Sequence, residues 1–491
     1  MNRSARRTWI RCGAAGVFFA AFGAAAAPAP AAASDFTVLH SFGYQPDGEY
    51  PEGRLVQGSD GTLYGTTYQG GVNGYGMAFS ITPGGTLSTL HSFTGADGQQ
   101  LDSGMTFGGD GNLYGTTPQG STCIDSNCTS FGGTVFKLTT SGVLTTIDYF
   151  AGNGLPHGSS PGDLTDGGDG YFYGTTAYGG AAGTSGLGTV FKVARNGKLI
   201  TLHSFTSDEP FFPVAGLTLG ADGNFYGATQ NGPGNANGTI FMVTPAGAVS
   251  TVHSFSGTDG AYPGGKLLLA RDGNFYGTTG GGGASGAGTI YRLTPAGSLT
   301  TLYAFNGGDG DGPAPGLVQW ANGDLYGVTS GGGDSGGGTL FKITLAGALT
   351  TLHLFTFADG VNPDVGPILG RDGLLYGTAV QGGGGTLPTG SAFEFDPAAP
   401  HPPVLSLTKV CFNELGECLP PWDSVVGGYA GLVWYSANVG DCRASGHWHG
   451  SKPTGGSIEF ETLIAGSHTY TLTCRSANGP VTASTTINVG P

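Results

Sequence analysis

The stretch GKLLLARDGNFYGTTGGGGASGAGTIYRLTPAGSLTTLYAF at residues 265–305 decides the fold. Asp272-Gly273 is a dipeptide favoured in tight hairpin turns, and Pro295-Ala296-Gly297 marks a second turn. The segments around these turns are rich in aromatic and β-branched residues, which suit pleated strands. Four strands are therefore expected, at 265–270, 274–279, 288–294 and 298–305. Strands joined in this way predict one blade of a β-propeller.

The same pattern recurs along most of the chain. Its phrase LYGTT, with small variations, places tyrosine at seven positions about 50 residues apart: Tyr64, Tyr114, Tyr173, Tyr226, Tyr276, Tyr326 and Tyr376. A period of this length is typical of propeller blades and not of helical solenoids. The Asp-Gly turn recurs as well, and Asn322-Gly323 takes its place once. Residues 35–397 are therefore predicted to form a seven-bladed β-propeller in an all-β protein.

The N-terminal phrase FTVLHSF (36–42) repeats the strand that closes each blade, as in TLSTLHSF and KLITLHSF. The last repeat stops at Pro397 without such a strand. We therefore expect residues 36–42 to complete the seventh blade and to close the ring, which removes an unpaired strand edge.

Residues 1–34 have the pattern of an export signal. Arg3, Arg6, Arg7 and Arg11 precede an apolar run that ends in alanines. The protein is therefore expected to be exported, to the periplasm, the cell surface or the medium, with no membrane span in the mature chain, and to be a monomer. The formal charge of −15 argues against a nucleic-acid partner.

The repeated DGxLYGTTxxGG, followed by GTVFKxT and TLHSF, resembles the GloVer tandem-repeat family of exported bacterial proteins. The resemblance covers residues 35–397 and implies an extracellular or surface protein with a variable C-terminal anchor. This chain ends at Asn488-Val489-Gly490-Pro491, without the apolar or basic tail of an anchor.

The C-terminal part changes character. A proline-rich linker at 398–403 leads to alternating strand-like segments at 404–491, which predict a β-sandwich. The stretch VWYSANVGDCRASGHWHGSKPTGGS resembles the Ig-like domains of exported bacterial proteins. Six of the seven cysteines follow the predicted export signal, and in an oxidising compartment they favour disulfides over zinc. Their order along the chain suggests the pairs Cys123–Cys128, Cys411–Cys418 and Cys442–Cys474.

The long loops after the LYGTT strands and between the repeats are expected on one face of the ring, where binding residues usually lie. Tyrosines in these loops, and one tryptophan of the C-terminal part, could stack on sugar rings. The candidates are Tyr68, Tyr75, Tyr178, Tyr262 and Trp448. For Trp448 the simpler interpretation is a loop side chain that covers the nearby disulfide.

Aspartates recur on the same face and could hold calcium, which prefers carboxylate and carbonyl oxygens. The candidates are Asp47, Asp97, Asp259, Asp309, Asp311 and Asp359. Asp-Gly pairs also form turns, so the turn interpretation competes with calcium as a cofactor. The histidines of the HSF phrase are expected to pack or to form hydrogen bonds.

No serine–histidine–aspartate phrase, phosphate loop or zinc signature appears in the sequence. The sequence therefore predicts a non-catalytic binding or adhesion protein for carbohydrate or a cell-surface polymer. Two alternatives remain open: a carbohydrate-active hydrolase or lyase that uses an irregular blade, with the second or third favoured, and a purely structural envelope component.

Overall fold

The computed structural model describes residues 35–399 apart from 45, 121–131, 151–156, 181–185, 233, 235–236, 334–335 and 385–388. Of the C-terminal part it describes seven strands between residues 404 and 489. The predicted export signal lies outside the described residues, as do residues 400–403 of the predicted linker. The described residues form strands, turns and loops, and none of them belongs to a helix that could cross a bilayer.

Seven antiparallel sheets follow one another between residues 36 and 395 of the described chain. The first contains β3 (Val56–Gln57), β4 (Leu63–Thr67), β6 (Met77–Ile81) and β7 (Leu87–Ser92). The second contains β8 (Thr106–Phe107), β9 (Leu113–Thr117), β10 (Thr134–Leu138) and β11 (Leu144–Tyr149). The third contains β12 (Ser159–Pro161), β13 (Thr165–Asp166), β14 (Tyr171–Tyr178), β15 (Thr189–Ala194) and β16 (Lys198–Ser204).

The next three sheets repeat this order. The fourth contains β17 (Phe211–Leu219), β18 (Phe225–Asn231), β19 (Thr239–Val243) and β20 (Val249–Ser254). The fifth contains β21 (Ala261–Pro263), β22 (Leu268–Leu269), β23 (Phe275–Gly281), β24 (Thr289–Leu293) and β25 (Leu299–Ala304). The sixth contains β26 (Asp311–Pro313), β27 (Val318–Gln319), β28 (Leu325–Gly331), β29 (Thr339–Ile343) and β30 (Leu349–Leu354).

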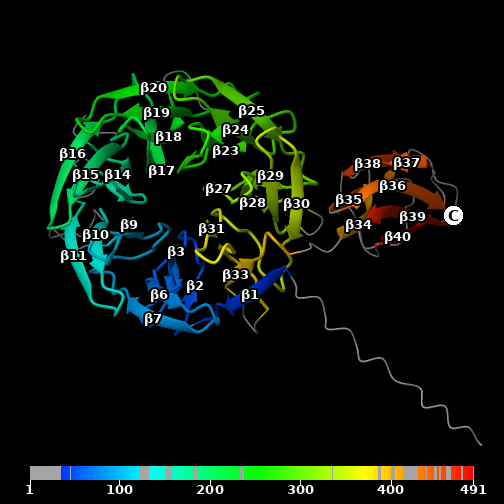
Figure 1. Ribbon diagram of the computed structural model, residues 1–491, viewed down its shortest axis with the longest axis horizontal. Coiled ribbons are helices and arrows are strands. Elements are labelled where there is room, and N and C mark those ends of the chain that lie inside the picture. Colours follow the sequence, from blue (N-terminus) through cyan, green and yellow to red (C-terminus); the bar gives the residue numbers. More distant parts are fainter. Residues whose placement is uncertain are drawn as a thin grey trace, which may run out of the picture. The chain divides into compact units, whose positions relative to one another are not determined.

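The seventh sheet combines the two ends of this region. It contains β31 (Ile368–Leu369), β32 (Leu375–Ala379), β33 (Ser391–Phe395) and, from the N-terminus, β1 (Phe36–Ser41). β1 pairs antiparallel with β33, from Phe36 opposite Phe395 to Ser41 opposite Ser391. The strand predicted to complete the last sheet therefore does so, and Figure 1 shows β1 beside β33. A short ladder of β2 (Gly48–Glu49) and β5 (Gln69–Gly70) lies outside the seven sheets.

The hydrophobic core lies between neighbouring sheets. Among the described residues it consists of seven clusters, one for each pair of successive sheets and one that joins the seventh sheet to the first. The last of these packs Phe42 and Phe79 with Tyr376 and Ala392. Because every sheet packs against the next and the last against the first, the sheets form a closed ring (Figure 1).

Glycine in the LYGTT phrase has a packing reason. At Gly115 of β9, a Cβ atom would lie 2.5 Å from Cζ of Phe136, the buried aromatic ring opposite it on β10. The turn aspartate at the start of the phrase is bonded too: Tyr276 Oη donates to Asp272 Oδ2 at 2.7 Å. Turn and strand therefore stabilise each other within one repeat.

A residue in the left-handed conformation lies in the innermost strand of every sheet or a few residues before it. Seven equivalent residues have φ between 52° and 60°: Tyr50, Gln100, Ser160, Phe212, Tyr262, Gly312 and Asn362. This conformation is strained for residues other than glycine. At Tyr262 it is held by a hydrogen bond from the backbone nitrogen to the carbonyl oxygen of Asn237, in the preceding repeat. Equivalent hydrogen bonds to the preceding repeat hold all of these positions except Ser160, for which none is described.

The C-terminal part forms two sheets. One contains β34 (Val404–Phe412), β35 (Tyr429–Ala437) and β38 (Gly455–Phe460). The other contains β37 (Gly450–Lys452), β36 (Val439–Gly446), β39 (Gly466–Ser476) and β40 (Gly479–Val489). The predicted disulfide Cys442–Cys474 is present and joins β36 to β39, paired neighbours in one sheet. The pairs Cys123–Cys128 and Cys411–Cys418 depend on residues outside the described ones.

Candidate functional site at the centre of the ring

The innermost strand of each sheet is interrupted. In the fifth sheet, Pro263 lies opposite Thr279 and Leu268 opposite Tyr276. The inner strand advances by five residues from Pro263 to Leu268, while β23 advances by three between Thr279 and Tyr276. The inner strand therefore contains two extra residues. A bulge of this kind bends a strand and re-aims its side chains. The sequence predicts one continuous strand at 265–270, whereas the structure has two short strands on either side of a bulge that contains Lys266.

One position of this bulge differs from repeat to repeat. It lies two residues before the residue that pairs with the LYGTT tyrosine, and its seven occupants are Arg54, Gly104, Asp163, Gly216, Lys266, Gly316 and Gly366. Four are glycine because space is scarce. A Cβ atom at Gly104 would lie 2.8 Å from the carbonyl oxygen of Arg54, and one at Gly216 would lie 2.7 Å from Cβ of Asp163. We call Arg54, Asp163 and Lys266 the waist.

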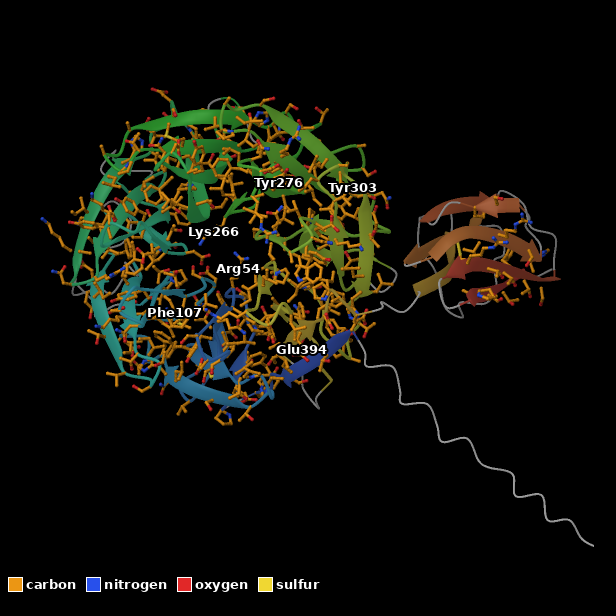
Figure 2. The ribbon with its side chains drawn as sticks, in the orientation of Figure 1. Arg54, Phe107, Lys266, Tyr276, Tyr303 and Glu394 are labelled. Atoms are coloured by element: carbon orange, nitrogen blue, oxygen red, sulfur yellow. A yellow bond between two sulfur atoms is a disulfide. The ribbon has the colours of Figure 1, made fainter. Side chains whose placement is uncertain are left out.

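Cavities lie on both sides of the waist, which lines each of them. One, of about 450 Å³, opens toward the short Asp-Gly hairpins, where Gln57 and Arg371 line it. The other, of about 500 Å³, opens toward the long loops, and we call it the loop-side cavity. Figure 2 shows Arg54 and Lys266 near the middle of the ring. The further lining of the loop-side cavity includes Tyr68, Tyr178, Gln100, Glu52, Asp102 and Asp364.

Three carboxyl groups of the loop-side cavity have raised pKa values. Burial, followed by repulsion from Asp102 and Asp364, raises the pKa of Glu52 to about 7. Burial is also the main cause that raises the pKa of Asp102 to about 6, with the charge of Asp163 adding to it. The pKa of Asp364 is raised by burial. Near neutral pH this wall therefore holds a mixture of protonated and ionised carboxyls, which can donate and accept hydrogen bonds.

Arg54 and Asp163 of the waist form hydrogen bonds with the backbone of neighbouring repeats. Arg54 Nη2 donates to the carbonyl oxygen of Pro367 at 3.0 Å, just before β31 in the neighbouring seventh repeat. Its Nε is buried and has no hydrogen-bond partner. Asp163 Oδ1 accepts from the backbone nitrogen of Gly104 at 2.8 Å. Burial lowers the pKa of the Lys266 ammonium, although the charge of Asp163 opposes this effect.

Two of the predicted ligand-binding tyrosines line this cavity and two do not. Tyr68 and Tyr178 belong to its wall, and Tyr178 packs edge-to-face on Phe212. Tyr75 and Tyr262 are exposed at the surface and do not line the cavity. The prediction for Trp448 falls on a residue outside the described ones.

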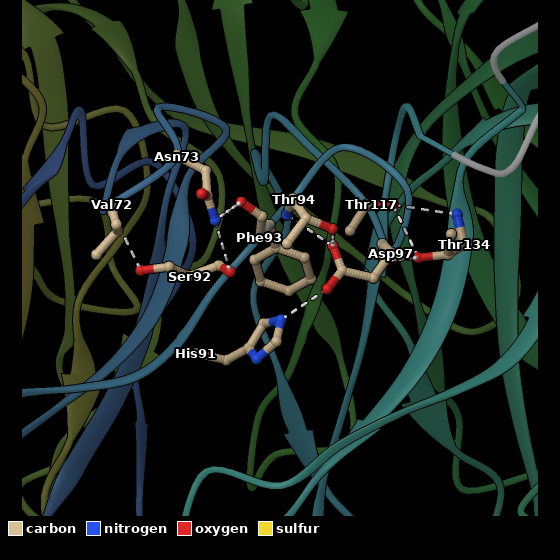
Figure 3. Close-up of polar contacts among 9 residues, drawn as sticks. All are labelled: Val72, Asn73, His91, Ser92, Phe93, Thr94, Asp97, Thr117 and Thr134. Atoms are coloured by element: carbon tan, nitrogen blue, oxygen red, sulfur yellow. Dashed lines mark hydrogen bonds and ion pairs between the residues drawn. The ribbon is translucent and has the colours of Figure 1, made fainter.

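The predicted calcium ligands have protein partners in their own repeats. Asp97 Oδ2 lies 2.9 Å from Nε2 of His91, and Oδ1 accepts from the backbone nitrogen and the hydroxyl of Thr94, both at 2.8 Å (Figure 3). The same arrangement joins His253 to Asp259 and His353 to Asp359. In the third repeat, Glu209 replaces the aspartate beside His203.

The remaining candidates follow this pattern in part. Tyr303 replaces histidine and donates its hydroxyl to Asp309, whereas Asp47 lies 3.5 Å from His40. Asp311 lies on β26 and is exposed. Within the described ranges, no three histidine, cysteine or acidic side chains gather where they could hold a metal ion. Asp97, Asp259 and Asp359 therefore have a structural role as partners of the HSF histidines, and calcium binding on this face stays a prediction.

The family model of the Gloeobacter/Verrucomicrobia repeat matches three successive segments, at 23–152, 125–270 and 265–407. Together they span more than half of the sequence. The chain belongs to the Gloeobacter/Verrucomicrobia repeat family. Among curated proteins, none matches it.

Solved structures with a similar arrangement show little sequence identity to this Gloeobacter/Verrucomicrobia repeat protein. The extracellular domains of two hybrid two-component systems from B. thetaiotaomicron match 93% of this chain, at 13% and 10% identity and TM-scores of 0.48 and 0.49. A surface component of the type-IX secretion system of Porphyromonas gingivalis matches 92%, at 12% identity and a TM-score of 0.45. The chain spans only 58%, 59% and 60% of the lengths of these structures.

The repeats also explain why sequence analysis missed the waist. The waist consists of isolated charged residues: Arg54, Asp163 and Lys266. They lie in segments that match poorly between repeats, after a proline two or three residues earlier and before the LYGTT phrase. A signal was present, since glycine occupies this position in the other four repeats. The deviation from glycine becomes visible only when the segments are aligned on the tyrosine, and its meaning depends on the ring that brings the three side chains together.

Proposed function

We propose that this protein is exported and binds carbohydrate, or a cell-surface polymer built from it, in the loop-side cavity. In this proposal the ring is a seven-bladed β-propeller that serves as a rigid scaffold, and the C-terminal sheets form an Ig-like sandwich that acts as a spacer or adhesive module.

The observation that supports this proposal is the composition of the cavity wall. Tyr68 and Tyr178 lie in the same wall as Gln100, Asp102 and Glu52. Aromatic rings pack on the apolar faces of sugars, while amide and carboxyl groups pair with their hydroxyls. A concave site with a few convergent polar groups is the usual form of a small-ligand site.

Titration of the purified protein against a polysaccharide panel tests the proposal. We expect saturable binding to at least one polymer, weakened about tenfold or more by Tyr178→Ala, because an aromatic contact contributes about 1.5–3 kcal/mol when buried. Tyr262→Ala is the matched control, since Tyr262 is exposed outside the cavity. Equal losses in both variants, or binding unaffected by either, would contradict the cavity as the site.

A second candidate, a carbohydrate-active hydrolase, is favoured by one observation. The raised pKa of Glu52 near 7 is typical of a general acid, and Asp102 is close enough to contribute to it. These carboxyls come from the first and second repeats, whereas sequence analysis favoured the second or third. The same titrations are therefore assayed for new reducing ends. Product that disappears in Glu52→Gln would favour the hydrolase over the binding protein.

A further inference from the structure

The cavity of about 450 Å³ on the hairpin side of the waist has both polar and apolar walls, and we call it the hairpin-side cavity. Its apolar lining consists of Leu55, Val56, Met105, Leu164, Ile368 and Leu369. Leu369 of β31 keeps 37% of its surface exposed. A concave, partly apolar site with a few polar groups is the usual form of a small-ligand site. The hairpin-side cavity is therefore a second candidate site, on the opposite side of the waist from the loop-side cavity.

The charged side chains that line the hairpin-side cavity are Arg54, Arg371, Lys266 and Asp163. A guanidinium stays protonated in proteins, whereas burial lowers the pKa of the Lys266 ammonium. Counted on the arginines alone, two positive charges face the one carboxylate of Asp163. The turn aspartates of the hairpins do not line the cavity, and the one beside Arg371, Asp372, accepts a hydrogen bond from Tyr376 Oη at 2.6 Å. The lining of this cavity thus carries an excess of positive charge.

The other acidic side chains at the centre of the ring lie on the far side of the waist. Three carboxyl groups line the loop-side cavity and not the hairpin-side cavity: Glu52, Asp102 and Asp364. Their charges offset those of Arg54 and Lys266, which line both cavities. Arg371 lines the hairpin-side cavity alone. The charges of the centre are therefore nearly balanced in total but separated along the ring axis, and an anion is attracted to the hairpin side.

Arg371 has a counterpart whose side chain is engaged differently. Arg271 occupies the same place in the fifth repeat, directly before the Asp-Gly turn. Both backbone nitrogens donate to a glutamine Oε1 of a neighbouring repeat, that of Arg271 to Gln319 at 3.0 Å and that of Arg371 to Gln57 at 2.8 Å. The Arg271 guanidinium also donates to the carbonyl oxygen of Ala321 at 3.2 Å. Among the residues that the structure describes, the Arg371 guanidinium has no such bond, and it is exposed at the cavity. The same side chain is thus bonded to the protein in one repeat and available to a ligand in the other.

We infer that the hairpin-side cavity binds a small organic acid, whose carboxylate pairs with the Arg371 guanidinium and whose apolar body contacts Ile368 and Leu369. A guanidinium presents two parallel donors that match the two oxygens of a carboxylate. Arg54 contributes charge more than donors, because its Nη2 already donates to the carbonyl oxygen of Pro367. The apolar wall offers nothing to an inorganic anion, so an acid with an apolar body fits best. This site is separate from the carbohydrate site proposed for the loop-side cavity and does not depend on it.

Isothermal titration with benzoate, benzyl alcohol, acetate and inorganic phosphate tests the inference, because these probes separate the charge from the apolar body. We expect benzoate to bind saturably and the other three to bind about tenfold or more weaker, since each lacks either the carboxylate or the apolar body. Arg371→Gln should weaken benzoate binding about tenfold or more, because a charged hydrogen-bond pair is lost. Arg371→Lys should restore part of the affinity, since it keeps the charge without the paired donors. Leu369→Ala should weaken the binding of benzoate and leave that of acetate unchanged.

Arg271→Gln is the matched control, because Arg271 holds the equivalent position and lines neither cavity. It should leave the affinity for benzoate unchanged. Thermal unfolding separates binding from folding. Arg371 is exposed and its backbone bond to Gln57 remains in the variant, so Arg371→Gln is expected to melt at the temperature of the unaltered protein. A larger loss of stability in Arg371→Gln than in Arg271→Gln would show that Arg371 has a structural role, and would overturn the inference.

The outcomes distinguish this site from the carbohydrate site. Equal affinity of the unaltered protein and Arg371→Gln for benzoate, or no saturable binding of benzoate, would overturn the inference and leave the carbohydrate proposal intact. Phosphate bound more tightly than benzoate would overturn the assignment of an organic acid. Benzoate binding that depends on Arg371 and is unchanged in Tyr178→Ala would support a separate site, whether or not any polysaccharide binds.

Discussion

At the scale of single residues, five of the six candidate aspartates have a histidine or tyrosine as their partner in the same repeat. The pair His91–Asp97 joins the outer strand β7 to the loop that leads into the second repeat. Asp97 also holds that loop through Thr94. These contacts lower the pKa of Asp97 although burial opposes them. The carboxylate therefore stabilises a junction between repeats.

Replacement of Asp97 by alanine should lower the free energy of unfolding at pH 7 by about 1–2 kcal/mol, because several hydrogen bonds to a charged group are lost. The folded-state pKa of Asp97 is below its unfolded value, so its contribution is present above the unfolded value and is lost as the pH falls through the folded value. Urea unfolding at pH 7 and at acidic pH measures this. Asp208→Ala, at an exposed aspartate, is the control. If the difference in unfolding free energy between the unaltered protein and Asp97→Ala were the same at acidic pH as at pH 7, this explanation would be wrong.

At the scale of elements, the LYGTT strands depend on glycine at their centre. In five repeats at least, a Cβ atom at this glycine would lie 2.4 to 2.7 Å from a buried aromatic ring on the next strand, as at Gly65, Gly115, Gly174, Gly227 and Gly377. The aromatic ring fills the place of the absent side chain. Strand propensity alone would disfavour glycine here, so its recurrence reflects packing between paired strands.

Gly115→Ala should therefore destabilise the protein by about 1–3 kcal/mol, since an added methyl group forces a buried ring out of its position. Gly43→Ala is the control, because a Cβ atom at Gly43 would meet nothing within 4 Å. Differential scanning calorimetry of both variants gives the comparison. If the two variants melt at the same temperature, the packing explanation for the LYGTT glycine is wrong.

At the scale of the whole molecule, one strand from the N-terminus closes the ring. Phe36 stacks on His353, with ring centroids 3.8 Å apart, and also packs on Phe393. Phe42 lies in the cluster between the seventh and first sheets. β1 thus contributes to two inter-sheet cores and satisfies the edge of β33. Stability of the ring is therefore shared between its first and last residues.

Removal of residues 35–42 should destabilise the ring cooperatively, by about 3–6 kcal/mol from the two phenylalanines alone. Calorimetry should show a single transition at lower temperature, and the exposed edge of β33 should promote aggregation. A chain that lacks only residues 1–34 is the matched control. Equal melting temperatures for the two shortened chains would rule out closure as a source of stability.

The sequence by itself determined the repeat, its strands and the origin of the closing strand. These features depend on local patterns: the Asp-Gly turns, the alternating strand residues and the copy of the HSF phrase at residues 36–42. It also indicated Tyr68 and Tyr178 as residues of the long-loop side, since they follow their strands directly.

Only the tertiary structure decided which of these residues share a site. Arg54, Asp163 and Lys266 lie in the first, third and fifth repeats, each more than 100 residues from the next, and line the same cavities because the ring brings the inner strands to one centre. The hydrogen-bond partners of the aspartates could not be predicted from the sequence either. Turn chemistry and calcium ligation use the same residue, and only the position of a histidine ring six residues earlier, on a paired strand, distinguishes them.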